Sequence, residues 1–299
     1  MKNILSIAMS ALLLCSMLAS CKKEPKETLA QEQAPIPINV STSLWTKVTD
    51  NGYEENDKVG IYVVNWSNDT QSQLLSSGNH ADNAGFTFSG GVWMPDDSLY
   101  WLDQSTKADF YCYYPYVESV VDVASFPFSV NLDQSTDAGY KFSDLLWGKT
   151  EGVSPTPDPV GIMTNHLMSN LLIYLQPGSG YSEETFAATQ KSVSVTGVLY
   201  SANVNLATGE VIPVGEPSDL IPKPEDGYYR VLIVPQSVVD APLVRVVING
   251  DEYTLNQSID FESNRQYKCT VTVNRTGEGV DIGIGDWIVD DDDYGGVVE

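Results

Sequence analysis

The run VGIYVVNW, residues 59–66, is a short apolar stretch rich in valine, isoleucine and tyrosine. β-Branched and aromatic residues of this kind favour strands. Similar runs recur at 86–88, 99–101 and 108–114, each bounded by clusters of Gly, Asn, Asp or Ser. Short strands at this spacing predict an all-β sandwich rather than a helical protein.

A second set of strands is expected after the proline cluster SPTPDP, residues 154–159, which is the best candidate for a boundary or an exposed excursion. Asn249-Gly250 joins two apolar runs and predicts a type I′ hairpin turn. The clean alternation in QYKCTVTVN, residues 266–274, would present one apolar face to a second core. The further expected strands of this half are 171–175, 193–200, 229–234, 243–248 and 252–255. Only 185–189 predicts a helical turn.

The amino terminus has the pattern of a secretory leader: Lys2 is followed by an apolar segment too short to span a bilayer comfortably. The segment ends in Leu-Ala-Ser-Cys, residues 18–21, which resembles the lipobox of bacterial lipoproteins. We therefore expect residues 1–20 to be a lipoprotein signal peptide and Cys21 to be acylated. A flexible polar tether follows at 21–35, because this stretch carries proline and lacks aromatic residues.

The charge balance is strongly acidic. The 299 residues include 16 Lys plus Arg against 40 Asp plus Glu, which gives a formal net charge of -24. Such a chain repels polyanions, which argues against nucleic acid and anionic lipid surfaces as partners. The run Asp290–Asp293 is interpreted as part of a solvated acidic tail, residues 290–299, because an EF-hand loop begun at Asp290 would extend past the last residue.

With Cys15 in the leader and Cys21 expected to be acylated, two cysteines remain, Cys112 and Cys269, and each shares a strand face with apolar neighbours. We interpret both as small core residues rather than as a disulfide. The two histidines, His80 and His166, have no second ligand at metal-binding spacing, and familiar catalytic motifs are missing from the sequence. We therefore expect no catalytic residues, no metal and no cofactor, and the protein is predicted not to be an enzyme.

Several stretches together resemble the fimbrillin family, lipoprotein precursors of the type V pili of Gram-negative anaerobes. The resemblance covers roughly residues 37–289 and the lipobox. The stretches are NDKVGIYV (56–63), FYCYYPY (110–116), DLLWGKT (144–150), NHLMSNLLIYL (165–175), VLIVPQ (231–236) and IGIGDW (282–287).

The resemblance implies an all-β fold of two tandem transthyretin-like Greek-key β-sandwich domains, which we place at 36–160 and 161–289. It also implies an outer-membrane lipoprotein at the cell surface, within a fimbrium, whose partners are other pilus subunits. In such pilins a protease removes the first strand, and the groove accepts a strand of a neighbouring subunit. This is β-strand addition, in which main-chain hydrogen bonds supply pairing and alternate side chains fill pockets.

Carried onto this chain, the removable strand is residues 36–44, with Ile36, Ile38 and Val40 as its inward plugs. Lys47 falls where the family has its basic cleavage residue. The alternative is a permanent first strand with Lys47 as an ordinary surface lysine, and both interpretations stay open.

Two features depart from a stalk pilin. The first arginine is Arg230, so an arginine-specific protease would find no site near residue 47, and the acidic tail is a poor plug for an apolar groove. Residues 280–289, with Ile282 and Ile284 as plugs, are the other candidate donor strand, but their release would remove the last strand from its own domain. A tip or accessory subunit, or an anchored surface protein that never polymerises, is therefore as credible as a stalk subunit.

The alternative function is a surface-anchored glycan-binding lipoprotein that does not polymerise, with a host or bacterial surface ligand. Aromatic rings can stack on sugars. The candidates for this role are Trp66, Trp93, Trp101, Tyr113, Tyr114 and Tyr116.

Overall fold

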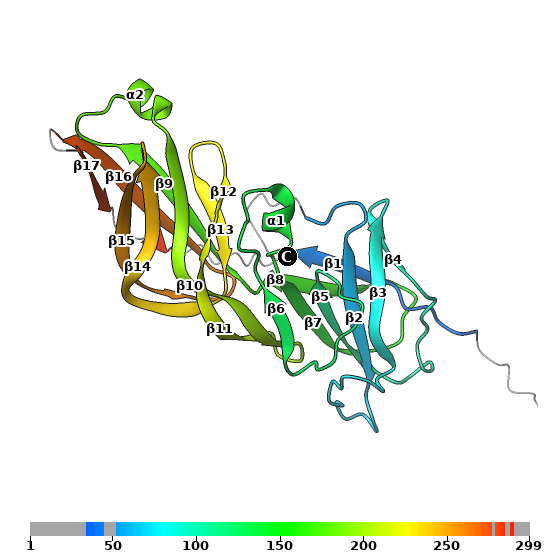
Figure 1. Ribbon diagram of the computed structural model, residues 1–299. Helices are drawn as coiled ribbons and strands as arrows, with labels where there is room; N and C mark the ends of the chain where they lie inside the picture. Colours follow the sequence, from blue (N-terminus) through cyan, green and yellow to red (C-terminus); the bar gives the residue numbers. More distant parts are fainter. Residues whose placement is uncertain (1–33, 45–51, 277–278, 285–287, 290–299) are drawn as a thin grey trace, which may run out of the picture. The chain divides into compact units, whose positions relative to one another are not determined.

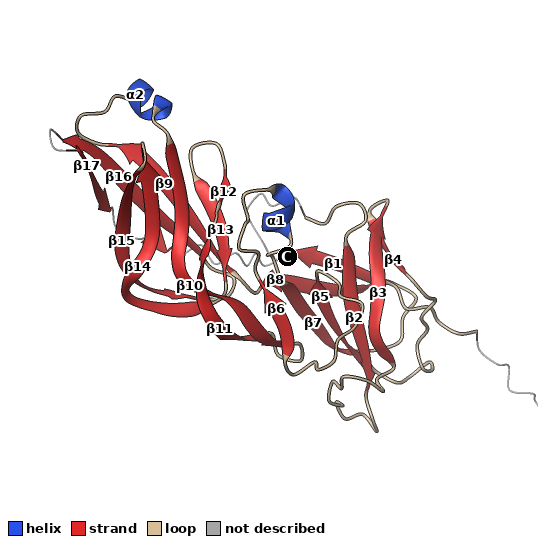
Figure 2. Ribbon diagram, viewed as in Figure 1, coloured by secondary structure: helices blue, strands red, loops and turns tan. Residues whose placement is uncertain are grey.

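The computed structural model describes residues 34–44, 52–276, 279–284 and 288–289. Strands dominate this part of the chain, which confirms the all-β class (Figure 2). The two helices found among the described residues are α1 (Asp137–Lys141) and α2 (Glu183–Ala188). Helix α2 begins at Ser182, whose hydroxyl accepts from the Thr185 backbone N–H in a capping box. The helical turn predicted at 185–189 overlaps α2, although the predicted start lies two residues after the first residue of the helix.

The first sheet has seven strands. Their order is β1 (Val40–Leu44), β8 (Val160–His166), β7 (Leu146–Val153), β5 (Ala108–Tyr114), β2 (Lys58–Asn65), β3 (Ala81–Ser89) and β4 (Val92–Pro95). The sheet is curved so that its two edge strands meet. Trp93 Nε1 on β4 donates to Thr42 Oγ1 on β1 at 2.8 Å. In Figure 1, β1 lies alongside β8.

The two central strands of this sheet are buried on both faces. One face packs inside the curve of the sheet, with Val59, Ile61 and Phe110 in one apolar cluster. Alternate residues on the other face, such as Tyr62 and Tyr113, belong to a second cluster. Strands β2 and β5 are thus buried along almost their whole length, because each separates two cores.

Two further sheets follow. One contains β11 (Glu210–Leu220), β10 (Lys191–Asn205), β14 (Gln236–Ile248) and β15 (Asp251–Phe261), with β6 (Phe126–Ser129) paired to β10. The other contains β12 (Lys223–Pro224), β13 (Tyr229–Ile233), β9 (Ser169–Pro177), β16 (Gln266–Thr276) and β17 (Gly279–Ile284), with β18 (Ile288–Val289) paired to β16.

The apolar faces of these two sheets share one core. Val195 on β10 and Val246 on β14 lie in the same cluster as Ile173 on β9 and Val271 on β16, all fully buried. The turn between β14 and β15 has positive φ at both Asn249 and Gly250, as a type I′ hairpin requires. The predicted hairpin is confirmed.

The described residues from Pro35 onward form one compact unit. The predicted boundary at 160/161 falls at the start of β8, whose partners β1 and β7 both lie in the seven-stranded sheet. The division of this unit into two Greek-key domains, and the assignment of the leader, tether and acidic tail, stay predictions.

Both described cysteines are free and buried, as expected of small core residues. Cys112 packs beside Phe110 and Tyr114, and Cys269 beside Tyr267 and Val271. Burial raises the pKa of each thiol to about 12. At pH 8 both thiols are therefore protonated, and the thiolate is the form that reacts.

This predicts that neither cysteine reacts with iodoacetamide in the folded protein at pH 8, whereas both react in denaturant. The measurement is peptide mass spectrometry of the segments that contain Cys112 and Cys269, before and after unfolding. Alkylation of Cys112 in the native protein, at a rate close to that in denaturant, would contradict the burial seen here.

Candidate functional site: the groove of the first strand

The first strand, residues 36–44, pairs through its backbone with two different segments along its length. Its start pairs with the segment around Tyr100, because the Ile38 N–H donates to the Leu99 carbonyl at 2.8 Å and the Trp101 N–H donates to the Ile36 carbonyl at 2.9 Å. Further along, β1 runs parallel to β8, in register from Val40 opposite Val160. The strand therefore completes the backbone pairing of two separate segments.

The side chains proposed as plugs face the interior of the seven-stranded sheet. The exposed fraction is 1% for Ile38 and 5% for Val40, and both belong to the core inside the seven-stranded sheet. Ile36 is half-buried and packs against the same core. The intervening Asn39 and Ser41 are exposed, so the alternation is that of a strand with one buried face. The two fully buried plugs contribute about 3 to 6 kcal/mol of burial free energy.

A polar cluster fastens the second half of the strand. The Trp93 indole N–H donates to Thr42 Oγ1, and the Tyr53 hydroxyl lies 3.0 Å from Thr164 Oγ1 and also hydrogen-bonds the Thr42 side chain. The Trp93 and Tyr53 rings meet edge to face, with 4.9 Å between their centroids. Burial raises the pKa of Tyr53 far above its usual value, so its hydroxyl remains a hydrogen-bond donor.

Sequence reasoning missed this cluster. Trp93 was assigned to sugar stacking, and neither Tyr53 nor Thr164 was singled out. The available signal was position: Thr42 stands two residues after Val40, in phase with the plugs, so its side chain points toward the same interior. A hydroxyl at such a position needs a hydrogen-bond partner.

The remaining predicted site residues lie elsewhere. Cys21 and Lys47 fall outside the described residues. Ile282 and Ile284 belong to β17, where they stand opposite Val273 and Val271 of β16. Strand β17 is the outer strand of its sheet in the described part of the chain, so β16 is its backbone partner there.

The aromatic residues proposed for sugar stacking are mostly unavailable. The side chains of Trp93, Trp101, Tyr113 and Tyr114 are at least 94% buried, which contradicts a stacking role for these four. Their rings fill the cores on either side of the seven-stranded sheet instead.

A separate cavity of about 690 Å³ lies beside helix α1. Lys141 Nζ lies 2.8 Å from Asp57 Oδ1, and His166 Nδ1 lies 2.7 Å from Asp144 Oδ1. The Tyr114 hydroxyl also donates to Asp57. Lys141 neutralises Asp57, and His166 and Tyr114 hydrogen-bond the neighbouring carboxylates, an arrangement typical of a structural network.

The two histidines both have protein partners. His166 contacts Asp144, and His80 Nε2 lies 2.6 Å from the Tyr100 carbonyl oxygen. In the part of the chain that the structure describes, no three His, Cys, Asp or Glu side chains are grouped to hold a metal ion. Within the same residues, no helix has the length and apolar character to cross a membrane.

Comparison with known proteins identifies the class of this fold. The family model described as "Fimbrillin-like" matches residues 46–287. The chain belongs to the fimbrillin-like family.

Individual relatives are distant but nearly full length. A Bacteroides uniformis protein described as "Putative fimbrium subunit Fim1C" is 22% identical over 293 residues, which is 93% of each chain. A solved structure from Bacteroides ovatus, described as a "putative cell adhesion protein", superposes with a TM-score of 0.67 at 16% identity and covers 87% of this chain and 100% of its own. A Bacteroides uniformis structure with the same description gives 0.63 at 18% identity, with coverages of 83% and 96%. These likenesses confirm the fold.

Proposed function

We propose that this protein is a structural or adhesive subunit of a bacterial surface fimbria, and that it joins other subunits by strand exchange. Its family and the fimbrium description of its Bacteroides uniformis relative support the first part. The precursor would be a lipoprotein carried to the outer membrane by acylated Cys21, and two or more acyl chains at that residue would hold it there firmly. Its role would be mechanical, without catalysis.

The observation that carries the exchange step is the position of the first strand. Its side chains Ile38 and Val40 enter the core, and its backbone pairs first with the segment around Tyr100 and then with β8, where it is the edge strand of the seven-stranded sheet. The link from this strand to β2 contains Lys47. Cleavage after Lys47 would leave the strand held only by noncovalent contacts, and its loss would expose an apolar groove to a second subunit.

The donor proposed for this groove is residues 280–289, with Ile282 and Ile284 as plugs. Strand β17 lies at the edge of its sheet in the described residues, so its release breaks pairing with β16 alone. Release of a central strand would break two ladders. Donation of β17 therefore disrupts the donor's own sheet less than donation of a central strand would. After release, β16 would need a new partner or would become an exposed edge.

The test is the intact mass and the amino terminus of protein recovered from the cell surface, before and after trypsin. We expect a terminus at Val48 and a ladder of oligomers that resists detergent without heating. Lys47→Gln should abolish both, whereas Lys149→Gln, which removes an exposed lysine from β7, should leave both unchanged.

Recovery of a lipidated monomer that keeps residues 36–47 after trypsin would reject the exchange step. Such a protein would instead be anchored through a permanent first strand. Failure of palmitate to label Cys21 would reject the lipid anchor and leave the exchange step to be judged by the ladder.

A further inference from the structure

The cavity beside helix α1 has the size of a ligand site. Its volume of about 690 Å³ lies within the range of roughly 300 to 1,000 Å³ that is typical of small-molecule pockets. Its wall joins elements that are distant in the chain: Lys58 on β2, Tyr140 on α1, His166 on β8 and Arg230 on β13. Side chains held by several regular elements keep a binding site in shape.

The charged side chains around this cavity are paired within the protein. Lys141 Nζ lies 2.8 Å from Asp57 Oδ1. Glu225 Oε1 lies 2.8 Å from Lys223 Nζ and 2.7 Å from Arg230 Nε. A charged ligand would have to compete with one of these partners, whereas a neutral ligand would not. The wall therefore favours a neutral ligand, and the net charge of -24 on the whole chain disfavours an anion further.

Paired groups of this kind still form hydrogen bonds to a ligand. A carboxylate has about four acceptor sites, and an ammonium group donates in several directions. A sugar hydroxyl both donates and accepts, so it can bond to the acid and to the base of one pair. The Lys141–Asp57 and His166–Asp144 pairs both line the cavity, and they offer the mixed donors and acceptors that suit a polyhydroxylated molecule.

The cavity also has an exposed aromatic ring. Phe142 follows α1 and lines the cavity, and 56% of this residue is exposed. Tyr140 is only 6% exposed, and the Arg230 guanidinium lies 4.1 Å from its ring centroid, so that ring belongs to the wall. Tyr116, one of the residues that the sequence suggested for sugar stacking, is half-buried and lines the same cavity. A ring beside hydrogen-bonding groups suits a sugar, whose apolar face stacks while its hydroxyls reach the polar wall.

We propose that the cavity beside α1 binds a neutral oligosaccharide, which stacks on Phe142 and hydrogen-bonds to the Lys141–Asp57 and His166–Asp144 pairs. This inference rests on the adhesive half of the proposed function and names the class of ligand. It is independent of strand exchange, because the cavity lies within a single chain.

The first test probes the full chain against an array of immobilised oligosaccharides. We expect binding to neutral oligosaccharides, and a signal roughly tenfold weaker for the sialylated or sulfated forms of the same chains. Lactosamine chains of animal type and microbial glucans and mannans on the same array distinguish a host source from a bacterial one. The free form of the best-bound sugar should compete with the immobilised form.

The second test measures the affinity for that free sugar by titration calorimetry. Phe142→Ala should weaken binding about tenfold, whereas Phe142→Tyr keeps the ring and should change the affinity by less than about threefold. The fold should tolerate both variants, because the side chain is exposed and the backbone N–H that caps α1 is retained. Asp144→Asn keeps the shape of a wall group and removes its charge, and it should also weaken binding. Val121→Ala, at a residue that is 87% exposed and outside the cavity lining, is the matched control and should bind as the wild type does.

Binding of no neutral oligosaccharide, equal binding of the neutral and sialylated forms, or an unchanged affinity of Phe142→Ala would each overturn the inference. These outcomes are distinct from a failure of the proposed function. An oligomer ladder on the cell without sugar binding would reject this site and retain the subunit role. Sugar binding by a chain that never forms a ladder would reject strand exchange and retain the site.

Discussion

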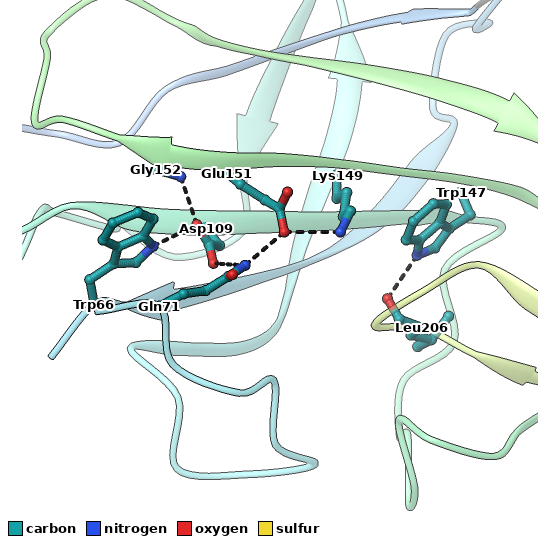
Figure 3. A network of polar contacts seen from close by, with 8 residues as sticks. All are labelled: Trp66, Gln71, Asp109, Trp147, Lys149, Glu151, Gly152 and Leu206. Atoms are coloured by element: carbon teal, nitrogen blue, oxygen red, sulfur yellow. Dashed lines mark hydrogen bonds and ion pairs between the residues drawn. The ribbon is translucent and has the colours of Figure 1, made fainter. Parts of the chain in front are cut away.

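Asp109→Ala should lower the free energy of unfolding by about 3 to 5 kcal/mol. The Asp109 carboxylate is fully buried on β5 and accepts three hydrogen bonds: from Trp66 Nε1 at 2.7 Å, Gln71 Nε2 at 3.0 Å and the Gly152 N–H at 2.7 Å (Figure 3). Removal of the acceptor leaves these donors without their partner. Replacement by alanine also leaves a cavity, which adds to the loss.

The measurement is a chemical denaturation curve with the midpoint and slope fitted separately. Glu151→Gln is the matched control, because Glu151 accepts from Gln71 and Lys149 at the exposed end of the same network. Surface ion pairs contribute little, so we expect a change below about 0.5 kcal/mol for this variant. Equal effects of the two substitutions would mean that Asp109 is not the centre of the network.

The network also shows which parts of the fold the sequence could reveal. Alternating apolar residues predicted the strands, the first strand and its plugs, because periodicity reports which face is buried. Asp109 stands inside ADFYCYY, residues 108–114, where its charge looks like an interruption of an apolar run. Its partners Gln71 and Gly152 are distant in sequence, so no local pattern could identify the contact.

The residues of the candidate site also fall into those that a local pattern predicts and those that depend on distant contacts. Ile38 and Val40 were predicted from their own strand, since burial of alternate residues is a local property. The role of Thr42 depends on Trp93, 51 residues away, and on the curvature that brings β4 to β1. Trp93 was therefore misassigned as a sugar-stacking residue, because composition alone does not show which face of a curved sheet a ring occupies.

The parallel pairing of β1 with β8 was also beyond local reasoning. Hairpin turns such as Asn249-Gly250 carry their own signal, and the structure confirms that one. A parallel pair has no such turn, and these two strands are separated by more than 100 residues. Long-range pairing of this kind is decided by the packing of the whole core rather than by either segment.

Gly148→Ala should be nearly as damaging as the loss of Asp109, at about 3 kcal/mol. A Cβ on Gly148 of β7 would overlap the carbonyl oxygen of Met163, and it would lie 2.8 Å from that carbonyl carbon and 3.0 Å from Thr164 Cα. All three atoms are backbone of β8, so no side-chain rotation can relieve the contact. The two strands must separate, which weakens the pairing between them.

The matched control for this substitution lies on the neighbouring strand. A Cβ on Gly161 of β8 would meet only Ser41 Oγ, at 3.9 Å, so Gly161→Ala should be neutral or slightly stabilising. Thermal unfolding of both variants measures the difference, and a midpoint for Gly148→Ala within 1 °C or so of the wild type would refute the backbone contact. Because β8 is also the partner of β1, displacement of β8 by Gly148→Ala should loosen the first strand as well. Faster proteolytic loss of residues 36–44 in this variant than in Gly161→Ala would show that the spacing of β7 and β8 holds the groove closed.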